Sequence, residues 1–183
     1  MVEEVWFATG NRHKFKEALD VFGTTDIALN QFEFKHNEIR SDSLEEIARE
    51  SVEAAYSELG KPVFVEDSGL FIDALEGFPG TYSAWVHKKL GNKGILKILE
   101  GVENRKARFE ACIAYHDGKT VETFKGICKG SISENEKGKG GFGYDPVFVP
   151  KGESSTFAES ITLKNKYSHR YKSLLELIRY LKN

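Results

Sequence analysis

Two adjacent acids lie inside an apolar run in the first half of the chain. The segment FVEDSGLFIDAL (64–75) is strand-like at both ends, and between its apolar halves lie Glu66, Asp67, Ser68 and Gly69. Ionised carboxylates are rarely buried unless they are paired or bind a metal ion. We therefore expect either a turn that reaches solvent or a pair of acids that holds a ligand.

Glu38 is the distant carboxylate that we expect to share a metal site with this segment. Mg²⁺ takes one or two carboxylates together with phosphate oxygens and water. A regular strand turns Glu66 and Asp67 to opposite faces, so one of them would share the ion with Glu38. Ser68 and Gly69 suit a sharp bend where a ligand and the backbone approach closely. A single glutamate ahead of a helix is also typical of a solvated surface, and both interpretations stay open.

The segment FATGNRHKFKE (7–17) is typical of a strand that leads into a helix. The N–H groups and the positive dipole end of a helix start bind anions, so Thr9, Gly10 and Asn11 are candidates for a phosphate contact. Lys14, one turn later, can meet phosphate oxygens as a point charge. The segment is explained equally well if Thr9 or Asn11 only caps the helix. The Walker A pattern GxxxxGK[ST] is absent from the sequence.

The glycine-rich segment GKGGFGYDPVF (138–148) combines two aromatic residues with an acid. Phe142 and Tyr144 have flat faces on which a nucleobase can stack, and Asp145 can accept hydrogen bonds. The alternative is a surface loop whose aromatic side chains fold back into the core.

A basic cluster lies at the start of the last predicted helix. In LKNKYSHR (163–170) it comprises Lys164, Lys166, His169 and Arg170. Such clusters are commonly solvated. Cations at a helix start oppose the helix dipole, however, which indicates an anionic or carbonyl-rich partner.

Hydrophobic periodicity predicts an α/β protein with a mixed sheet, because strands and helices intermix and one β-hairpin occurs. Ser43 and Glu46 have the spacing of a capping box, and Gly60 marks the end of the same helix. Asp117-Gly118 indicates the hairpin turn. We expect strands at 2–8, 26–35, 64–75, 105–115, 120–133 and 147–149, and helices at 12–22, 43–59, 82–99 (interrupted near Gly91 and Gly94) and 168–181.

Length and composition describe one globular domain, residues 1–183, with a formal net charge of −2 and 30% charged residues. This balance does not favour a nucleic-acid binder or a basic membrane-binding surface. No apolar run reaches the ~18 residues of a membrane span and no signal-peptide pattern occurs, so we expect a cytoplasmic protein. Cys112 and Cys128 form no CxxC pair, and we expect buried reduced thiols.

Together the polar segments offer a phosphate cradle, a carboxylate metal site, an aromatic platform and polar groups for a base. In this combination the sequence closely resembles the inosine/xanthosine triphosphate pyrophosphatase family. The resemblance is carried by five motifs in order, TGNRHK (9–14), EDSGL (66–70), GFPGTYSA (77–84), FGYDPVF (142–148) and SHR (168–170). It implies hydrolysis of (deoxy)ITP and XTP to the monophosphate and pyrophosphate with Mg²⁺, as a homodimer. It also implies an elongated mixed β-sheet flanked by helices, in two lobes with a central substrate cleft.

The resemblance also implies roles for particular residues. Asp67 corresponds to the general base and to a metal ligand, Glu38 to the second metal carboxylate, and Ser68 to a substrate contact. The residues implied to bind the triphosphate are those of the first motif, Thr9, Gly10, Asn11, Arg12, His13 and Lys14. The residues implied to hold the nucleoside are Phe142, Gly143, Tyr144, Asp145, Lys164, His169 and Arg170.

Three other functions fit parts of this pattern. A broader nucleotide pyrophosphatase would act on modified pyrimidines or standard dNTPs. A nucleotide-sensing module would bind without turnover and would not need Asp67 together with the metal carboxylates. An RNA-binding protein is disfavoured by the net charge and by the scatter of basic residues.

Overall fold

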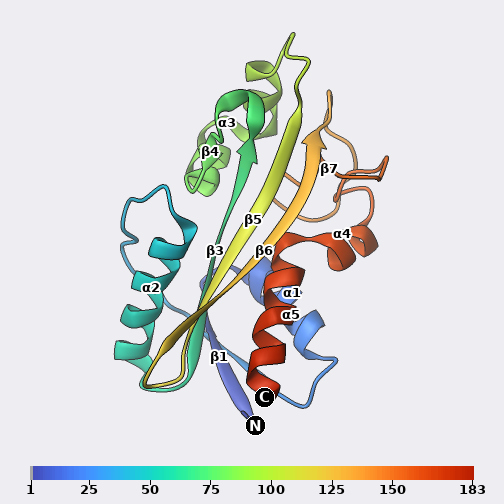
Figure 1. The fold of residues 1–183 in the computed structure, drawn as a ribbon. Coiled ribbons are helices and arrows are strands. Elements are labelled where there is room, and N and C mark those ends of the chain that lie inside the picture. Colours follow the sequence, from blue (N-terminus) through green and yellow to red (C-terminus); the bar gives the residue numbers. More distant parts are fainter. Residues whose placement is uncertain (1) are drawn as a thin grey trace. The chain divides into compact units, whose positions relative to one another are not determined.

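A computed structural model describes residues 2–183 and contains strands intermixed with helices (Figure 1). In chain order the elements are β1 (Glu4–Ala8), α1 (Arg12–Phe22), β2 (Ala28–Phe32), α2 (Leu44–Leu59), β3 (Val63–Ile72), a 3-10 turn (Asp73–Leu75), β4 (Pro79–Gly80), α3 (Ser83–Ile98), β5 (Lys106–His116), β6 (Val121–Ile132), β7 (Phe148–Pro150), α4 (Ile161–Tyr167) and α5 (His169–Lys182).

The strands form one mixed sheet in the order β2-β1-β3-β5-β6-β7, and β4 pairs with β3. β1 runs parallel to both β2 and β3, whereas β3–β4 and β6–β7 are antiparallel pairs. The chain divides into two compact units. Unit 1 comprises the chain up to Asp67 with 111–126 and 170–183, and unit 2 comprises 68–110 and 127–169. The predicted mixed sheet and two lobes are thus confirmed, whereas the substrate cleft stays a prediction.

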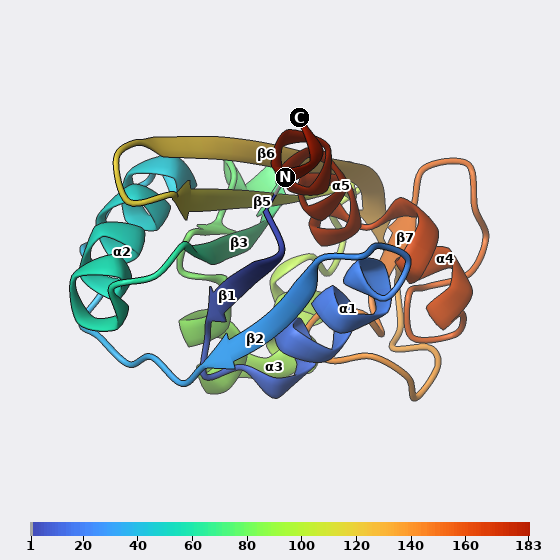
Figure 2. The same ribbon diagram turned by 90° about the horizontal axis from the view of Figure 1, so that it is seen from below.

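Unit 1 is built around its sheet strands and three helices. Helix α2 covers one face of the β2-β1-β3 layer, and α1 and α5 cover the other face (Figures 1 and 2). Aromatic rings fill the core under α1 and α5, where the centroids of Phe7 and Phe64 lie 4.4 Å apart and Phe22 stacks on Phe64. Leu174 and Leu177 of α5 complete this buried cluster. The core therefore fixes the end of β1, from which the turn into α1 departs.

Helix α2 begins and ends where the sequence predicts, although its N-terminal capping differs in detail. The Ser43 hydroxyl accepts a hydrogen bond from the Glu46 N–H at 3.3 Å. The Glu46 carboxylate, however, accepts from the Ser41 hydroxyl at 2.7 Å, and the Ser41 hydroxyl accepts from the Ser43 N–H. Gly60 ends the helix in the left-handed region with φ of 67°. In a capping box the glutamate side chain accepts the hydrogen bond from the N–H of the N-cap residue. Here the Ser41 hydroxyl accepts that bond from the Ser43 N–H instead.

Unit 2 has a second core, which includes Leu70 of β3, Ile95 of α3, Leu99 at the C-cap of α3, and Phe148 of β7. Helix α3 is kinked at Gly91, as its sequence predicts, with φ of 61° and ψ of −172°. In unit 1, the predicted β5–β6 turn is also confirmed, because the Asp117 carboxylate accepts hydrogen bonds from the N–H groups of Lys119 and Thr120 at 2.7 and 2.8 Å.

Of the two alternatives for Glu66 and Asp67, the turn that reaches solvent is wrong, and so is the sharp bend expected at Ser68 and Gly69, since β3 continues without a break from Val63 to Ile72. Gly69 is required for a different close approach, that of two strands. A Cβ at Gly69 would lie 2.2 Å from the carbonyl oxygen of Gly80 in β4.

The sequence pattern predicts neither β4 nor α4. Within residues 2–183, no helix is both long and apolar enough to cross a membrane.

Candidate functional site

The turn between β1 and α1 is held by two side chains of the first motif. The Thr9 hydroxyl accepts a hydrogen bond from the Asn11 N–H at 3.1 Å. The Asn11 carboxamide oxygen accepts from the N–H groups of His13 and Lys14 at 3.0 and 3.2 Å. Asn11 is therefore the N-cap of α1, as one of the two interpretations predicts. The cap fixes the backbone of the turn. Gly10, between Thr9 and Asn11, is the position of the turn that has no side chain.

A cavity of about 280 Å³ in unit 1 brings this turn together with the two predicted metal carboxylates. Thr9 and Gly10 line it from the turn, Glu38 from the loop after β2, and Asp67 from β3. A Cβ at Gly10 would have only the carbonyl oxygen of Phe34 within 4 Å, at 3.9 Å. Three segments that are distant in sequence thus share one hollow, which combines a helix start with carboxylates.

The donor set of this cavity suits a magnesium ion that is held jointly with a substrate. Within residues 2–183, no group of three or more His, Cys, Asp or Glu side chains is arranged to hold a metal. Mg²⁺ needs no such cage, because it commonly binds one or two carboxylates and completes its shell with phosphate oxygens and water. Glu38 and Asp67 supply two carboxylates of this kind beside a turn suited to phosphate.

Glu66, the neighbour of Asp67, belongs to a buried network of charges in unit 1. Its carboxylate, only 1% exposed, accepts hydrogen bonds from Arg170 Nε at 2.8 Å and Nη2 at 3.3 Å. Glu17 binds Nη1 of the same guanidinium at 2.5 Å. Desolvation by burial would lower the pKa of Arg170, but the charges of Glu66 and Glu17 outweigh it and raise this pKa above its ordinary value. Glu66 is therefore the buried counter-charge of Arg170.

Lys14 contacts the same residue from α1. Its ammonium donates a hydrogen bond to the Glu66 carbonyl oxygen at 2.9 Å and lies 3.5 Å from the Glu66 carboxylate. Lys14 and Arg170, predicted to bind the triphosphate and the nucleoside, are thus both held by Glu66. Their substrate contacts stay predictions.

Asp145 organises the glycine-rich segment of unit 2. Its Oδ2 atom accepts hydrogen bonds from the Phe142 N–H at 2.7 Å and from the Lys164 ammonium at 2.6 Å. The same ammonium lies 4.2 Å from the centroid of the Phe142 ring. A Cβ at Gly141 would meet Asp145 Oδ2 at 2.1 Å, and φ of 69° there also favours glycine. The structure thus brings together Phe142, Asp145 and Lys164, three of the residues predicted to hold the nucleoside. Gly141, which was not predicted, belongs to the same cluster.

The other predicted nucleoside residues are placed differently. Tyr144 is buried, and its hydroxyl donates to the Ser83 carbonyl oxygen at 3.0 Å, while burial raises its pKa. The alternative that aromatic residues of this segment fold into the core is thus correct for Tyr144. The His169 ring stacks on Phe109 with centroids 4.6 Å apart. The Gly143 carbonyl accepts from the Asn92 amide at 3.1 Å.

Arg12 and His13 lie exposed at the start of α1, and Ser68 is half-buried in β3. None of these three residues is among those that line the cavity of unit 1 within the described chain. Sequence reasoning missed His36 and Ser51, which do line it. His36 could have been identified from its position two residues before Glu38, in the predicted connection between a strand and a helix.

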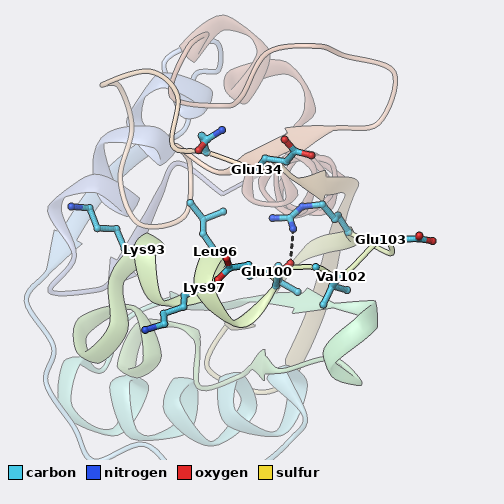
Figure 3. A pocket seen from close by; sticks show the side chains of 11 residues that line it. Lys93, Leu96, Lys97, Glu100, Val102, Glu103 and Glu134 are labelled. Carbon is cyan, nitrogen blue, oxygen red and sulfur yellow. Dashed lines mark hydrogen bonds between the residues drawn. The ribbon is translucent and has the colours of Figure 1, made fainter.

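A larger hollow of about 670 Å³ lies in unit 2, beside the end of α3 (Figure 3). Charges of both signs line it, among them Lys93, Lys97, Glu100 and Glu134. Arg105, which also lines it, donates to the carbonyl oxygens of Leu99, Ile132 and Ser133 at 2.9, 2.8 and 2.7 Å. This arginine thus ties backbone segments together, and the predicted site residues lie elsewhere.

These features define an α/β protein with a mixed sheet in which the first strand-to-helix turn shares a cavity with carboxylates. Residues 5–180 match the sequence model of the Ham1 family, and the chain belongs to that family.

Named relatives agree with the resemblance that the five motifs carry. A protein of Methanopyrus kandleri named dITP/XTP pyrophosphatase is 49% identical over 182 residues, which cover 98% of this chain and 97% of that protein. A protein of the same name from Saccharolobus solfataricus is 44% identical and covers 96% and 92%. The solved Ham1 protein of Staphylococcus aureus superposes with a TM-score of 0.84 at 30% identity and covers 98% of each chain.

Proposed function

We propose that this protein hydrolyses non-standard purine nucleoside triphosphates, dITP, ITP and XTP, to the monophosphate and pyrophosphate. The observation that carries the proposal is the cavity of unit 1, where Gly10 of a capped helix start shares a hollow with Glu38 and Asp67. Membership of the Ham1 family and the names of its relatives support the same activity. The protein would thereby remove damaged nucleotides from the pool.

In this proposal Glu38 and Asp67 would hold a magnesium ion, which when bound would supply positive charge beside the phosphate oxygens. Asp67 accepts the proton of the attacking water. Lys14 and the N–H groups of the turn that Thr9 and Asn11 leave uncapped meet the charge that develops on the phosphoryl oxygens. Thr9 and Asn11 hold the shape of the turn by accepting hydrogen bonds from the N–H groups of Asn11, His13 and Lys14.

In this proposal the nucleoside is bound by the residues that the family resemblance implies for it. The cluster of Phe142, Asp145 and Lys164 presents an aromatic ring beside a buried ion pair. Hypoxanthine and xanthine carry a carbonyl at the purine 6-position, where adenine carries an amino group. His169 and Arg170 can donate hydrogen bonds, so they suit the carbonyl. A site built for one group can reject its absence by up to ~10⁴-fold, because the buried partner is left unpaired.

The decisive experiment is product analysis with ITP and Mg²⁺. We expect IMP and pyrophosphate, with kcat/KM at least tenfold higher for ITP and XTP than for ATP. Asp67→Asn is the matched variant, because it preserves size while removing the negative charge. It should retain nucleotide affinity and lose most of kcat. Products IDP and orthophosphate, equal kcat/KM for ITP and ATP, or near wild-type kcat in Asp67→Asn would each contradict the proposal.

The same experiment separates the rival functions. Comparable turnover of pyrimidine or standard triphosphates would indicate the broader pyrophosphatase, and tight binding without turnover would indicate a sensing module. We further propose that the protein is a homodimer, as the family resemblance implies, and that it is cytoplasmic, as the sequence pattern predicts. Light scattering of the purified protein measures its assembly state.

A further inference from the structure

Asn92 is a buried residue of helix α3 to which the proposed mechanism gives no role. It follows Gly91, the residue at which α3 is kinked, and only 9% of it is exposed. Its amide nitrogen donates a hydrogen bond to the Gly143 carbonyl oxygen at 3.1 Å. Gly143 belongs to the glycine-rich segment, so Asn92 ties α3 to the part of the chain that is proposed to hold the nucleoside.

The kink in α3 has two glycines, one before Asn92 and one after it, in the sequence LGNKG (90–94). Gly91 has φ of 61°, a left-handed value that interrupts the right-handed helix. A Cβ at Gly94 would lie 2.5 Å from the Leu90 Cβ, so this position also needs a residue without a side chain. The local sequence therefore bends the helix around Asn92.

The glycine-rich segment contacts α3 at a second residue, Tyr144. Its hydroxyl donates to the Ser83 carbonyl oxygen at 3.0 Å, and the His87 ring lies edge-on to the Tyr144 ring with centroids 4.8 Å apart. Tyr144 thus anchors the segment to the part of α3 before the kink, and Asn92 anchors it to the part after the kink. The two anchors hold adjacent residues of the segment.

The amide oxygen of Asn92 distinguishes a positioning role from a role in stability. This oxygen is buried, and within residues 2–183 it has no hydrogen-bond partner. A buried polar atom without a partner costs as much stability as one hydrogen bond contributes, or more. The Asn92 side chain therefore contributes little net stability to the fold, and its remaining effect is to fix the Gly143 carbonyl.

We propose that Asn92 is a positioning residue, which sets the turn at Gly143 and thereby the place of the Phe142 ring in the nucleoside cluster. This inference rests on the proposed function, which assigns Phe142 to the nucleoside. The N–H of Phe142 donates to the Asp145 carboxylate at 2.7 Å, and its ring centroid lies 4.2 Å from the Lys164 ammonium. A change in the backbone at Gly143 displaces the preceding residue from both contacts.

The test replaces Asn92 by alanine and by aspartate. Alanine removes the donor together with the unpartnered oxygen, whereas aspartate keeps the size and places an oxygen against the Gly143 carbonyl. Asn92→Ala should raise KM for ITP about fivefold, the worth of one hydrogen bond, and change kcat less than twofold. Asn92→Asp should raise KM further, because two acceptors then face each other. The affinity for IMP, measured by calorimetry, should fall in parallel, and the affinity for inorganic pyrophosphate should stay unchanged.

Asn104→Ala is the matched control. Asn104 also belongs to unit 2, and its amide oxygen accepts a hydrogen bond from the Lys106 N–H at 3.2 Å in an exposed turn. This substitution should leave KM and IMP affinity unchanged. Urea unfolding measures the stability of each variant, and the midpoint of Asn92→Ala should lie within about 0.3 M of the wild type. Asn92→Asp serves in its place if Asn92→Ala does not fold.

Two outcomes would overturn the positioning role of Asn92 while ITP hydrolysis stood. The first is unchanged KM and IMP affinity in Asn92→Ala. The second is a lower urea midpoint with equal losses of IMP and pyrophosphate affinity, because the side chain would then support the fold as a whole. Selective loss of IMP affinity in a protein that does not hydrolyse ITP would uphold the positioning role and overturn the proposed function instead.

Discussion

Glu66→Gln is the substitution whose effect on stability follows most directly from the structure. The glutamine keeps the shape of the side chain and one carbonyl oxygen, but it removes a negative charge that is 1% exposed. Arg170, itself 3% exposed, then keeps Glu17 as its charged partner. Lys14 loses the carboxylate at 3.5 Å and keeps the Glu66 carbonyl oxygen at 2.9 Å.

The expected loss follows from the burial of both partners. Removing one member of a buried ion pair costs about 3–5 kcal/mol, since the remaining charge is left without compensation. Because Glu17 still contacts the guanidinium, we expect the lower end, about 3 kcal/mol. Glu17→Gln is the first control and should cost about 1 kcal/mol, because Glu17 is more exposed and the Glu66–Arg170 pair persists. Glu176→Gln, which breaks an exposed pair with Arg179, should cost less than about 0.5 kcal/mol.

Urea unfolding followed by circular dichroism measures these differences. With an m-value of about 2 kcal/mol/M, Glu66→Gln should lower the midpoint by about 1.5 M at unchanged slope. The two controls should give the order Glu66, Glu17, Glu176 in decreasing effect. A Glu66→Gln midpoint within 0.2 M (about 0.4 kcal/mol) of the wild type would refute the reading of Glu66 as the buried counter-charge of Arg170.

Two further predictions concern the glycines and the cysteines. Gly10→Ala should weaken pyrophosphate binding at least tenfold and leave the urea unfolding midpoint nearly unchanged, because the added methyl group enters the cavity. Gly69→Ala should lower the free energy of unfolding in urea by about 2 kcal/mol or more, because its methyl group meets the Gly80 carbonyl. Equal effects of the two substitutions on stability would contradict this prediction. Burial, followed by the charge of Glu45, raises the pKa of the Cys112 thiol to about 12. The native protein should therefore react slowly with a disulfide reagent at pH 8, and both thiols should react only in urea. The stability that the neutral Cys112 thiol contributes should be lost as the pH rises from 9 towards 12. Rapid labelling of the native protein would contradict this prediction, because it would show that the buried thiol is accessible.

Local signals predicted the helices that position the site. α1 occupies the expected range, 12–22, because an N-cap and an apolar stripe both lie in the sequence itself. The start and the end of α2 were correct for the same reason, since Ser43 and Gly60 act on neighbouring backbone groups. The carboxylates Glu38 and Asp67 were also expected to share a site, and they line one cavity.

Contacts between distant segments were not predictable in this way. β3 continues through two acids because the Glu66 carboxylate meets Arg170, which is 104 positions away. β4 is a pair of residues that is defined only by its partner strand. The His36 ring depends on Ser51 and Glu50, which α2 brings to it. None of these pairings leaves a periodic or compositional mark in the sequence.

The chain passes between the two units at four points, three of which fall inside β3, β5 and β6. Neither unit is therefore a contiguous stretch that a gene fragment could encode, and deletion of either end of the chain would remove part of unit 1. Unit 2 becomes continuous only if a short turn replaces 111–126, the end of the β5–β6 hairpin. A split or permuted version of this protein should accordingly be opened in a surface loop, for example near Gly118, and never at the places where one unit gives way to the other.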